Sequence, residues 1–273
     1  MTKPGEDRAI DLESLLSFYR EAGVTDAVGE EAVDRFREAA EAKPQQREAP
    51  RAALRPPAPP PPIRPAATAV PDEGQAALAR EEAAKAQTLD ELKAAMEAFN
   101  GCNLKFTAKN IVFSDGNPQA PLMLVGEAPG RDEDIEGLPF VGRSGQLLDR
   151  MLEAIGIDRT GAYVANVLPW RPPGNRTPTP LETEICRPFI ERQIALANPR
   201  VLVALGGSSA KVLLRAADGI MRLRGTWRTY RTADGVEMPI MPTLHPAYLL
   251  RNPAHKKLAW RDFLEIKAKL REG

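Results

Sequence analysis

Four short apolar runs, separated by segments with helical periodicity, constrain the fold of this chain more than any other feature. Each run is short enough for a buried strand. The runs are PLMLVG (121–126), AYVANV (162–167), RVLVALG (200–206) and MPIMPT (238–243). Helical patterns lie between them, over GQLLDRMLEAIG (145–156) and from Thr179 to Ala197. The alternation predicts an α/β fold, a three-layer α/β/α sandwich with a central, mainly parallel four-stranded sheet.

A proline-rich stretch divides the chain before this domain. Ten of the 26 prolines lie between Pro44 and Pro71. A segment this rich in proline cannot hydrogen-bond as helix or sheet, so residues 44–71 are predicted to be an extended, disordered linker. Residues 1–43 show helical periodicity and are predicted to form a small acidic helical arm. The compact domain is expected to span residues 72–273.

The charges are unevenly distributed between the arm and the rest of the chain. Residues 1–43 carry six basic and eleven acidic side chains, although the formal net charge of the whole chain is zero. The remainder is therefore modestly basic, which fits a nucleic-acid partner but fits a solvated surface of mixed charge equally well. Two distant cysteines suit a reducing cytosol. With no signal-peptide pattern and no long apolar run, a cytoplasmic protein without membrane contact is expected.

The residues of chemical interest follow the predicted strands, where parallel sheets collect their ligands. The first strand runs into GEAPGRDEDIEGLPFVGRSG (126–145), which is acidic and is predicted to be a loop because it is rich in glycine and proline. Charge runs of this kind usually face water, and no Walker sequence is present. Phe140 argues for a binding function, because it places an aromatic ring beyond the same strand end.

The second strand ends in NVLPWRPPGNRTPTP (166–180). Asn166 lies at the strand tip, where its amide can offer a donor and an acceptor to a ligand. Arg171 and Arg176, in a loop stiffened by prolines, are candidates for contacts with phosphates. An asparagine at a strand end is otherwise a common turn residue, so this segment alone decides nothing.

The last strand leads into LHPAYLLRNP (244–253). His245, one of two histidines, precedes a proline that favours extended backbone. Tyr248, Leu249 and Leu250 followed by Arg251 resemble an apolar wedge that enters a base stack beside a cation. A structural histidine and a buried apolar turn would have the same sequence.

Taken together, three motifs carry a specific resemblance. GEAPGRDEDIEGLPFVG, NVLPWRPPGNRTP and HPAYLLRNP, in this order, closely resemble those of the family-4 uracil-DNA glycosylases, over roughly residues 90–263. The resemblance implies a parallel sheet between helices, and an enzyme that extrudes a uracil nucleotide from DNA and hydrolyses its N-glycosidic bond.

The resemblance also implies a role for each matched position. Glu127 and Glu133 would lie near the attacking water, and His245 would stabilise negative charge on the departing base. The backbone of Ala128 would contact the base, Phe140 would stack on it and Asn166 would read its edge. The HPAYLLR segment would probe the helix and fill the gap left by the extruded nucleotide. Which of the two glutamates matters more does not follow from the sequence.

The chain departs from this family at the cysteines that hold a [4Fe–4S] cluster. The first Cys-x-x-Cys position is Phe99 and the second is Cys102, whereas Trp170 stands at the third position and Cys186 at the fourth. Two thiolates cannot supply four ligands. We therefore expect no cluster, no other metal site, an apolar plug formed by Phe99 and Trp170, and an approach of the two remaining thiols. A cluster completed by other ligands or a second chain is the alternative.

The leading interpretation is a uracil-DNA glycosylase for base excision repair. It is expected to be monofunctional, without strand cleavage, because no lysine occurs at the matched positions. Its substrate would be uracil-containing DNA, single- or double-stranded, and the chain would be a monomer. A non-catalytic DNA-binding or polymerase-associated protein with the same fold is the rival, and a glycosylase for another deaminated base is a third hypothesis. The arm could recruit a protein partner, dock on the basic body, or be an extension without catalytic consequence.

Overall fold

The computed structural model describes residues 74–272, which form one unit built on a six-stranded sheet. The predicted arm, linker and domain start lie outside the described residues. The strands are β1 (Ser114–Gly116), β2 (Leu122–Gly126), β3 (Ala162–Asn166), β4 (Val201–Leu205), β5 (Arg228–Arg231) and β6 (Glu237–Thr243). Their order in the sheet is β1-β3-β2-β4-β6-β5. The four central strands are parallel and correspond to the four predicted runs.

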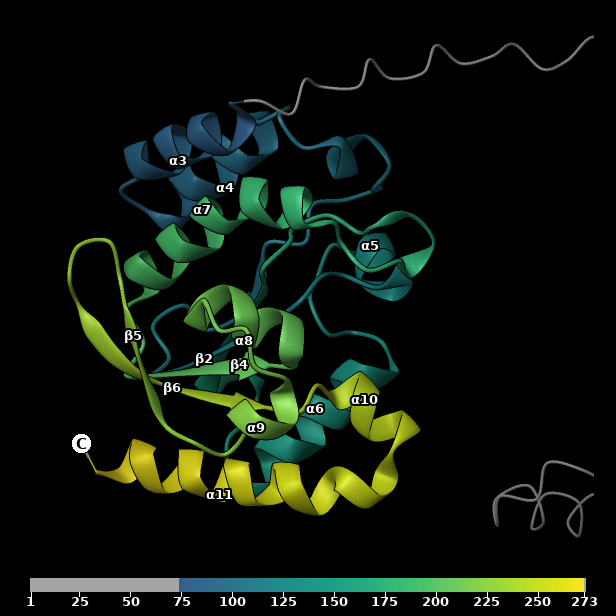
Figure 1. The fold of residues 1–273 in the computed structure, drawn as a ribbon, viewed down its shortest axis with the longest axis vertical. Coiled ribbons are helices and arrows are strands. Elements are labelled where there is room, and N and C mark those ends of the chain that lie inside the picture. Colours follow the sequence, from purple (N-terminus) through teal and green to yellow (C-terminus); the bar gives the residue numbers. More distant parts are fainter. Residues whose placement is uncertain (1–73, 273) are drawn as a thin grey trace, which may run out of the picture. The chain divides into compact units, whose positions relative to one another are not determined.

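Helices cover both faces of this sheet (Figure 1). The α-helices are α3 (Gln75–Lys85), α4 (Leu89–Ala98), α5 (Arg131–Glu136), α6 (Arg143–Ala154), α7 (Pro180–Ala197), α8 (Gly207–Leu214), α9 (Ile220–Leu223), α10 (Pro246–Arg251) and α11 (Lys256–Arg271). Short 3₁₀ turns span Asn103–Phe106, Arg159–Gly161, Pro173–Asn175 and Pro253–His255.

Alternate residues of the strands belong to two separate hydrophobic cores, because successive side chains of a strand point to opposite faces of the sheet. Met123 and Val125 of β2 belong to the core under α3, α4 and α7, whereas Leu122 and Leu124 belong to the core under α6 and α11. The central strands are therefore buried on both faces, which explains their continuous apolar runs. The predicted three-layer α/β/α class is confirmed.

The long helix α7 begins as its sequence predicts. The Thr179 hydroxyl accepts a hydrogen bond from Glu182 N at 3.2 Å, and the Glu182 carboxylate accepts one from Thr179 N at 2.8 Å. Pro180 occupies the first helical position, where its missing N–H costs nothing. This capping box fixes the point at which the loop after β3 ends.

Two features of the fold differ from the sequence prediction. The sheet is wider by β1 and β5, which pair antiparallel at its two edges and are too short and polar to give a strand signal. The segment after β2 is not entirely loop, because it contains α5. Gly130 caps the start of this helix and Gly137, at φ 75°, ends it, so the glycines limit the helix rather than prevent it.

Within residues 74–272, no helix is both long and apolar enough to cross a membrane.

Candidate active site

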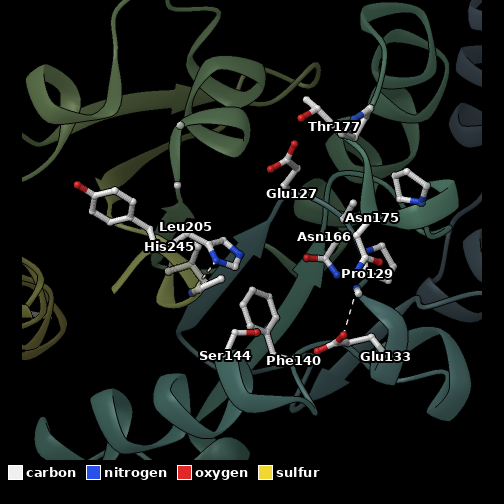
Figure 2. Close-up of a pocket in the computed structure, with 18 of the residues that line it drawn as sticks. Glu127, Pro129, Glu133, Phe140, Ser144, Asn166, Asn175, Thr177, Leu205 and His245 are labelled. Atoms are coloured by element: carbon white, nitrogen blue, oxygen red, sulfur yellow. Dashed lines mark hydrogen bonds between the residues drawn. The ribbon is translucent and has the colours of Figure 1, made fainter. Parts of the chain in front are cut away.

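A cavity of about 440 Å³ lies at the carboxyl ends of the central strands (Figure 2). Gly126 and Asn166 are the last residues of β2 and β3, and His245 follows the end of β6 by two residues. All six residues that the sequence assigns to the pocket line this single cavity: Glu127, Ala128, Glu133, Phe140, Asn166 and His245. The fold thus brings together three motifs that are up to 119 positions apart.

Asn166 presents an unsatisfied polar atom in this cavity. The side chain is 6% exposed, and its Oδ1 atom is buried without a hydrogen-bond partner in the structure. A buried amide oxygen left unpaired costs about 1–3 kcal/mol. Gly126 permits this arrangement, because a Cβ there would lie 2.3 Å from Asn166 Oδ1 and 2.7 Å from Phe140 Cζ. The oxygen is therefore placed to accept a hydrogen bond from a ligand.

Phe140 supplies an aromatic wall in a backbone conformation that is uncommon for a bulky residue. Its φ is 56°, and its ring is 4% exposed. Arg159 stabilises this turn by donating from Nη2 to the Phe140 carbonyl at 2.6 Å. Gly145 is required beside it, because a Cβ at this position would lie 1.7 Å from the same carbonyl oxygen. The ring is therefore held in place and can stack against a flat ligand in the cavity.

His245 lies against Phe140, with ring centroids 5.4 Å apart and an interplanar angle of 28°. Its Nδ1 accepts a hydrogen bond from Ala247 N at 3.1 Å, so in the neutral ring the proton is on Nε2. Burial, with a smaller contribution from Arg251, lowers the pKa of His245 to about 4. At neutral pH the residue is therefore an uncharged donor in the cavity.

The lowered pKa of His245 predicts a pH-dependent stability. Between pH 6.5 and 4 the unfolded state binds a proton at this position and the folded state does not. The contribution of His245 to the free energy of unfolding is therefore fully present above pH 6.5 and is lost as the pH falls toward 4. We expect this group to account for on the order of 3 kcal/mol over that interval. Urea denaturation of the wild type and of His245→Gln checks it, since the variant should lose this part of the pH dependence. Parallel curves would contradict the prediction.

The two glutamates of the first motif differ in their surroundings. The Glu133 carboxylate accepts hydrogen bonds from Gly130 N through Oε2 and from Gly142 N through Oε1, each at 3.1 Å. Glu127 is half-buried, and its carboxylate makes no hydrogen bond within the described residues, although its backbone carbonyl accepts one from Leu168 N at 3.0 Å. Figure 2 shows its carboxylate pointing toward Thr177. Glu133 therefore holds the loop that carries Phe140, whereas Glu127 is free to contact a ligand or water.

Comparison with known proteins identifies the family. The family model described as the Uracil DNA glycosylase superfamily matches residues 113–264, which is more than half of the chain and contains all three motifs. The chain belongs to this superfamily. The match starts just before β1 and ends within α11, so it covers the whole sheet of this glycosylase fold.

Curated members of the superfamily are similar over most of their own length. The type-4 uracil-DNA glycosylase of Saccharolobus solfataricus is 38% identical over 177 residues, covering 62% of this chain and 80% of the relative. That of Archaeoglobus fulgidus is 38% identical over 185 residues, covering 66% and 92%. That of Pyrobaculum aerophilum is 42% identical over 157 residues, covering 56% and 80%.

The four positions associated with a [4Fe–4S] cluster in the resembled glycosylases gather in the core under α3, α4 and α7. Cys102 and Cys186 are fully buried, and their Sγ atoms are 3.8 Å apart. Trp170 is 2% exposed. The ring of Phe99 packs edge-on against that of Phe189, with the ring centroids 5.2 Å apart. The expected approach of the two thiols and the burial of both aromatic side chains are confirmed.

These residues do not fit a cluster. The Cys186 thiol donates to Cys102, which raises the pKa of Cys186 well above its ordinary value, and burial raises it further. The same hydrogen bond lowers the pKa of Cys102. Only two thiols remain among the four positions, whereas a cluster of this kind takes four ligands. Within residues 74–272, no group of three or more His, Cys, Asp or Glu side chains is arranged to hold a metal ion. Aromatic packing thus occupies the place where two ligands would be needed.

The predicted wedge forms the short helix α10, and this corrects one assignment. Leu249 is 1% exposed and packs with Leu244 and Ala259, because the helix turns this side chain toward the protein. Leu249 is therefore not part of a DNA-facing tip. Tyr248 is half-exposed, lines the cavity, and shares a hydrogen bond of 2.7 Å with His255 Nδ1. Arg251 is exposed and also lines the cavity.

The two arginines predicted to contact phosphate are engaged within the protein. Arg176 makes a bidentate ion pair with the Glu182 carboxylate, in which Nη1 donates to Oε2 at 2.8 Å and Nη2 donates to Oε1 at 2.6 Å. Arg171 donates to Asn175 Oδ1 at 2.7 Å and lies 3.8 Å from the buried carboxylate of Asp134. Both side chains stabilise the loop after β3, and a phosphate contact by either remains a prediction.

Two residues that support the site have no signal in the sequence. Arg159 lies in a 3₁₀ turn, where nothing in the local pattern indicates that it holds the Phe140 carbonyl. Asp262 of α11 is 1% exposed and accepts from the Thr243 hydroxyl at 2.6 Å, which fixes the end of β6 just before His245. Their partners are distant in sequence, so only the folded chain identifies them.

Proposed function

We propose that this chain is a monofunctional uracil-DNA glycosylase that releases uracil from DNA and leaves an abasic site. The observation that carries the proposal is the unpartnered Asn166 Oδ1 in a cavity that also holds a stacking ring and a neutral histidine donor. Uracil presents an N–H at position 3 and a carbonyl at position 4. The Asn166 amide complements this edge, because Oδ1 accepts from N3–H and Nδ2 donates to O4.

His245 supplies the main electrostatic stabilisation in this proposal. When the C1′–N1 bond breaks, the electron pair leaves with uracil and negative charge develops on its O2 atom. An Nε2–H donor placed at this oxygen stabilises the transition state more than the ground state. The lowered pKa of His245 keeps the imidazole uncharged at neutral pH, so the hydrogen bond, and not a full positive charge, acts on the base.

Glu127 is proposed as the carboxylate that orients water. Its free carboxylate can favour the cationic sugar and accept a proton from the water whose oxygen bonds to C1′, while the uracil anion takes a proton from solvent. Glu133 is proposed to act indirectly, because both of its oxygens already accept backbone hydrogen bonds. The structure thus favours Glu127 between the two acids that the sequence could not rank.

The catalytic cycle is proposed to run without an iron–sulfur cluster. The thiols of Cys102 and Cys186 serve as core atoms in this account, so the double variant Cys102→Ala/Cys186→Ala should excise uracil within about threefold of the wild type, since small apolar substitutions in a core mainly affect stability. Iron and acid-labile sulfide analysis of the purified wild type should find neither in stoichiometric amount. Brown wild-type protein that loses its iron and its activity in the double variant would overturn this part of the account.

A base panel distinguishes this function from its rivals. Oligonucleotides that carry uracil, hypoxanthine, thymine or cytosine at one position, in single- and double-stranded form, are incubated with the full chain, and abasic sites are revealed with alkali. The proposal predicts cleavage at uracil and none at thymine or cytosine. Cleavage only at hypoxanthine would indicate a glycosylase for another deaminated base. Binding without any cleavage would indicate the non-catalytic rival.

A further inference from the structure

A second groove opens from the catalytic cavity between the loop after β3, the start of α7 and helix α8. Its volume is about 620 Å³, and it shares Glu127, Thr177 and Pro178 with the catalytic cavity. In Figure 2, Glu127 and Thr177 lie on the opposite side of the view from Phe140 and Ser144. We call this continuous extension the strand groove. A chain that enters the catalytic cavity can therefore continue along it.

The walls of the strand groove combine cations with apolar surface. Three cations line it: Arg187 of α7, Lys211 of α8 and Arg215, the residue that caps the end of α8. Prolines 178 and 180 and the apolar residues Val167, Leu168 and Val212 form the remaining lining, together with hydroxyl groups and Glu184. Phosphates are neutralised by lysine and arginine, whereas sugars and bases contact apolar surface, so this mixture suits a nucleic-acid strand.

Two of the three cations are available to a ligand. Arg187 is largely buried and lies between Glu184 at 2.9 Å and Glu191 at 3.5 Å, so its charge is compensated. Lys211 is exposed and makes no ion pair within residues 74–272. The Arg215 side chain is 73% exposed, with only a long contact of 3.7 Å to Glu191. Lys211 lies in the last turn of α8 and Arg215 is the C-cap residue of this helix, so both charges lie at its carboxyl end.

The loop after β3 does not offer comparable free charges. Arg171 and Arg176 are bound to Asp134 and Glu182, as described above. Arg251, by contrast, is exposed on α10 and lines the catalytic cavity without lining the strand groove. Arg251 thus lies at the catalytic cavity, whereas Lys211 and Arg215 lie at the carboxyl end of α8, along the extension of the cavity.

We propose that the strand groove binds the DNA strand that flanks the extruded uracil, with Lys211 and Arg215 in contact with its phosphates. This inference rests on the proposed function and extends it to the substrate outside the pocket. Because the groove leaves the cavity in one direction, it holds nucleotides on only one side of the uracil. Binding should therefore depend on which side of the uracil the strand continues.

The test uses the full chain and three single-stranded 15-nucleotide probes, with uracil at the centre, near the 5′ end or near the 3′ end. Affinity is measured by fluorescence anisotropy at several salt concentrations, and excision is measured separately. For Lys211→Ala/Arg215→Ala we expect about tenfold weaker binding of the central probe, and a slope of log affinity against log salt that is smaller by about 1.4, or about 0.7 for each lost phosphate contact. On one of the two end probes, the one whose strand does not extend into the groove, the variant and the wild type should bind with equal affinity.

The matched control is Lys267→Ala/Arg271→Ala, which removes a lysine and an arginine with the same spacing from α11. It should bind all three probes like the wild type. Equal affinity of the groove variant and the wild type, or an equal loss on both end probes, would overturn the strand groove. Failure of the wild type to excise uracil would instead overturn the proposed function, because the anisotropy measurement does not depend on excision.

Discussion

Replacing Asn166 with alanine is expected to lower kcat/KM on a uracil-containing oligonucleotide by about 100- to 1,000-fold, the range found when a preorganised polar group is removed from a buried site. The substitution removes the acceptor for N3–H and the donor for O4 while leaving the aromatic wall in place. Its effect on folding should be small, because Asn166 Oδ1 makes no hydrogen bond in the protein that the substitution could break. Single-turnover excision and thermal denaturation of the same preparation measure the two effects separately.

A matched control is Gln193→Ala. Gln193 is also a buried amide, 2% exposed, but it donates to the Tyr163 hydroxyl at 2.9 Å and to the Phe113 carbonyl at 3.3 Å, away from the cavity. This variant should lose stability and retain most of its activity per folded molecule. Equal activity losses in the two variants would show that Asn166 acts through folding and would contradict its role in base recognition.

Replacing Trp170 with alanine is expected to lower the free energy of unfolding by about 3–5 kcal/mol, the usual cost of removing a large aromatic side chain from a core. Trp170 is among the largest fully buried side chains, and it belongs to the same core as both cysteines. If aromatic packing stabilises this region, the loss should appear in urea denaturation whether or not iron is supplied. Trp260→Ala provides the control, because Trp260 is 44% exposed on α11 and should cost far less.

A small loss for Trp170→Ala, comparable with that of Trp260→Ala, would contradict the packing account. Stabilisation of the wild type by added iron and sulfide would contradict it more directly, since a ligand that binds only the folded state raises its stability. Either result would require a different explanation for the substitutions at Phe99 and Trp170.

The sequence predicted the central sheet because the four parallel strands are buried on both faces and therefore appear as uninterrupted apolar runs. It could not predict β1 and β5, whose polar residues pair only at the sheet edges. It also does not indicate α5, because a segment rich in glycine and proline favours a loop, whereas here Gly130 and Gly137 lie at the two ends of a helix. The local sequence pattern thus identifies buried strands and helices. It does not identify elements that depend on pairing at a sheet edge or on the residues that cap a helix.

The site residues were predicted by motif resemblance, and the cavity gathers those assigned to the pocket. The roles within it needed coordinates. Leu249 looks like a wedge residue in sequence but faces the core, because the helical geometry of α10 decides its direction. Glu127 and Glu133 are alike in chemistry, and only the hydrogen bonds of Glu133 separate them. Arg159 has no local signal, since its partner at Phe140 is 19 positions away.

The most direct test of the proposed activity is the release of free uracil under single-turnover conditions by the wild type and by His245→Ala, with a thymine-containing oligonucleotide as the blank. The account predicts one uracil released for each substrate molecule by the wild type, no base released from the blank, and a rate about 100- to 1,000-fold lower for the variant. A folded wild type that releases no uracil, or a variant that releases it as fast as the wild type, would contradict the account.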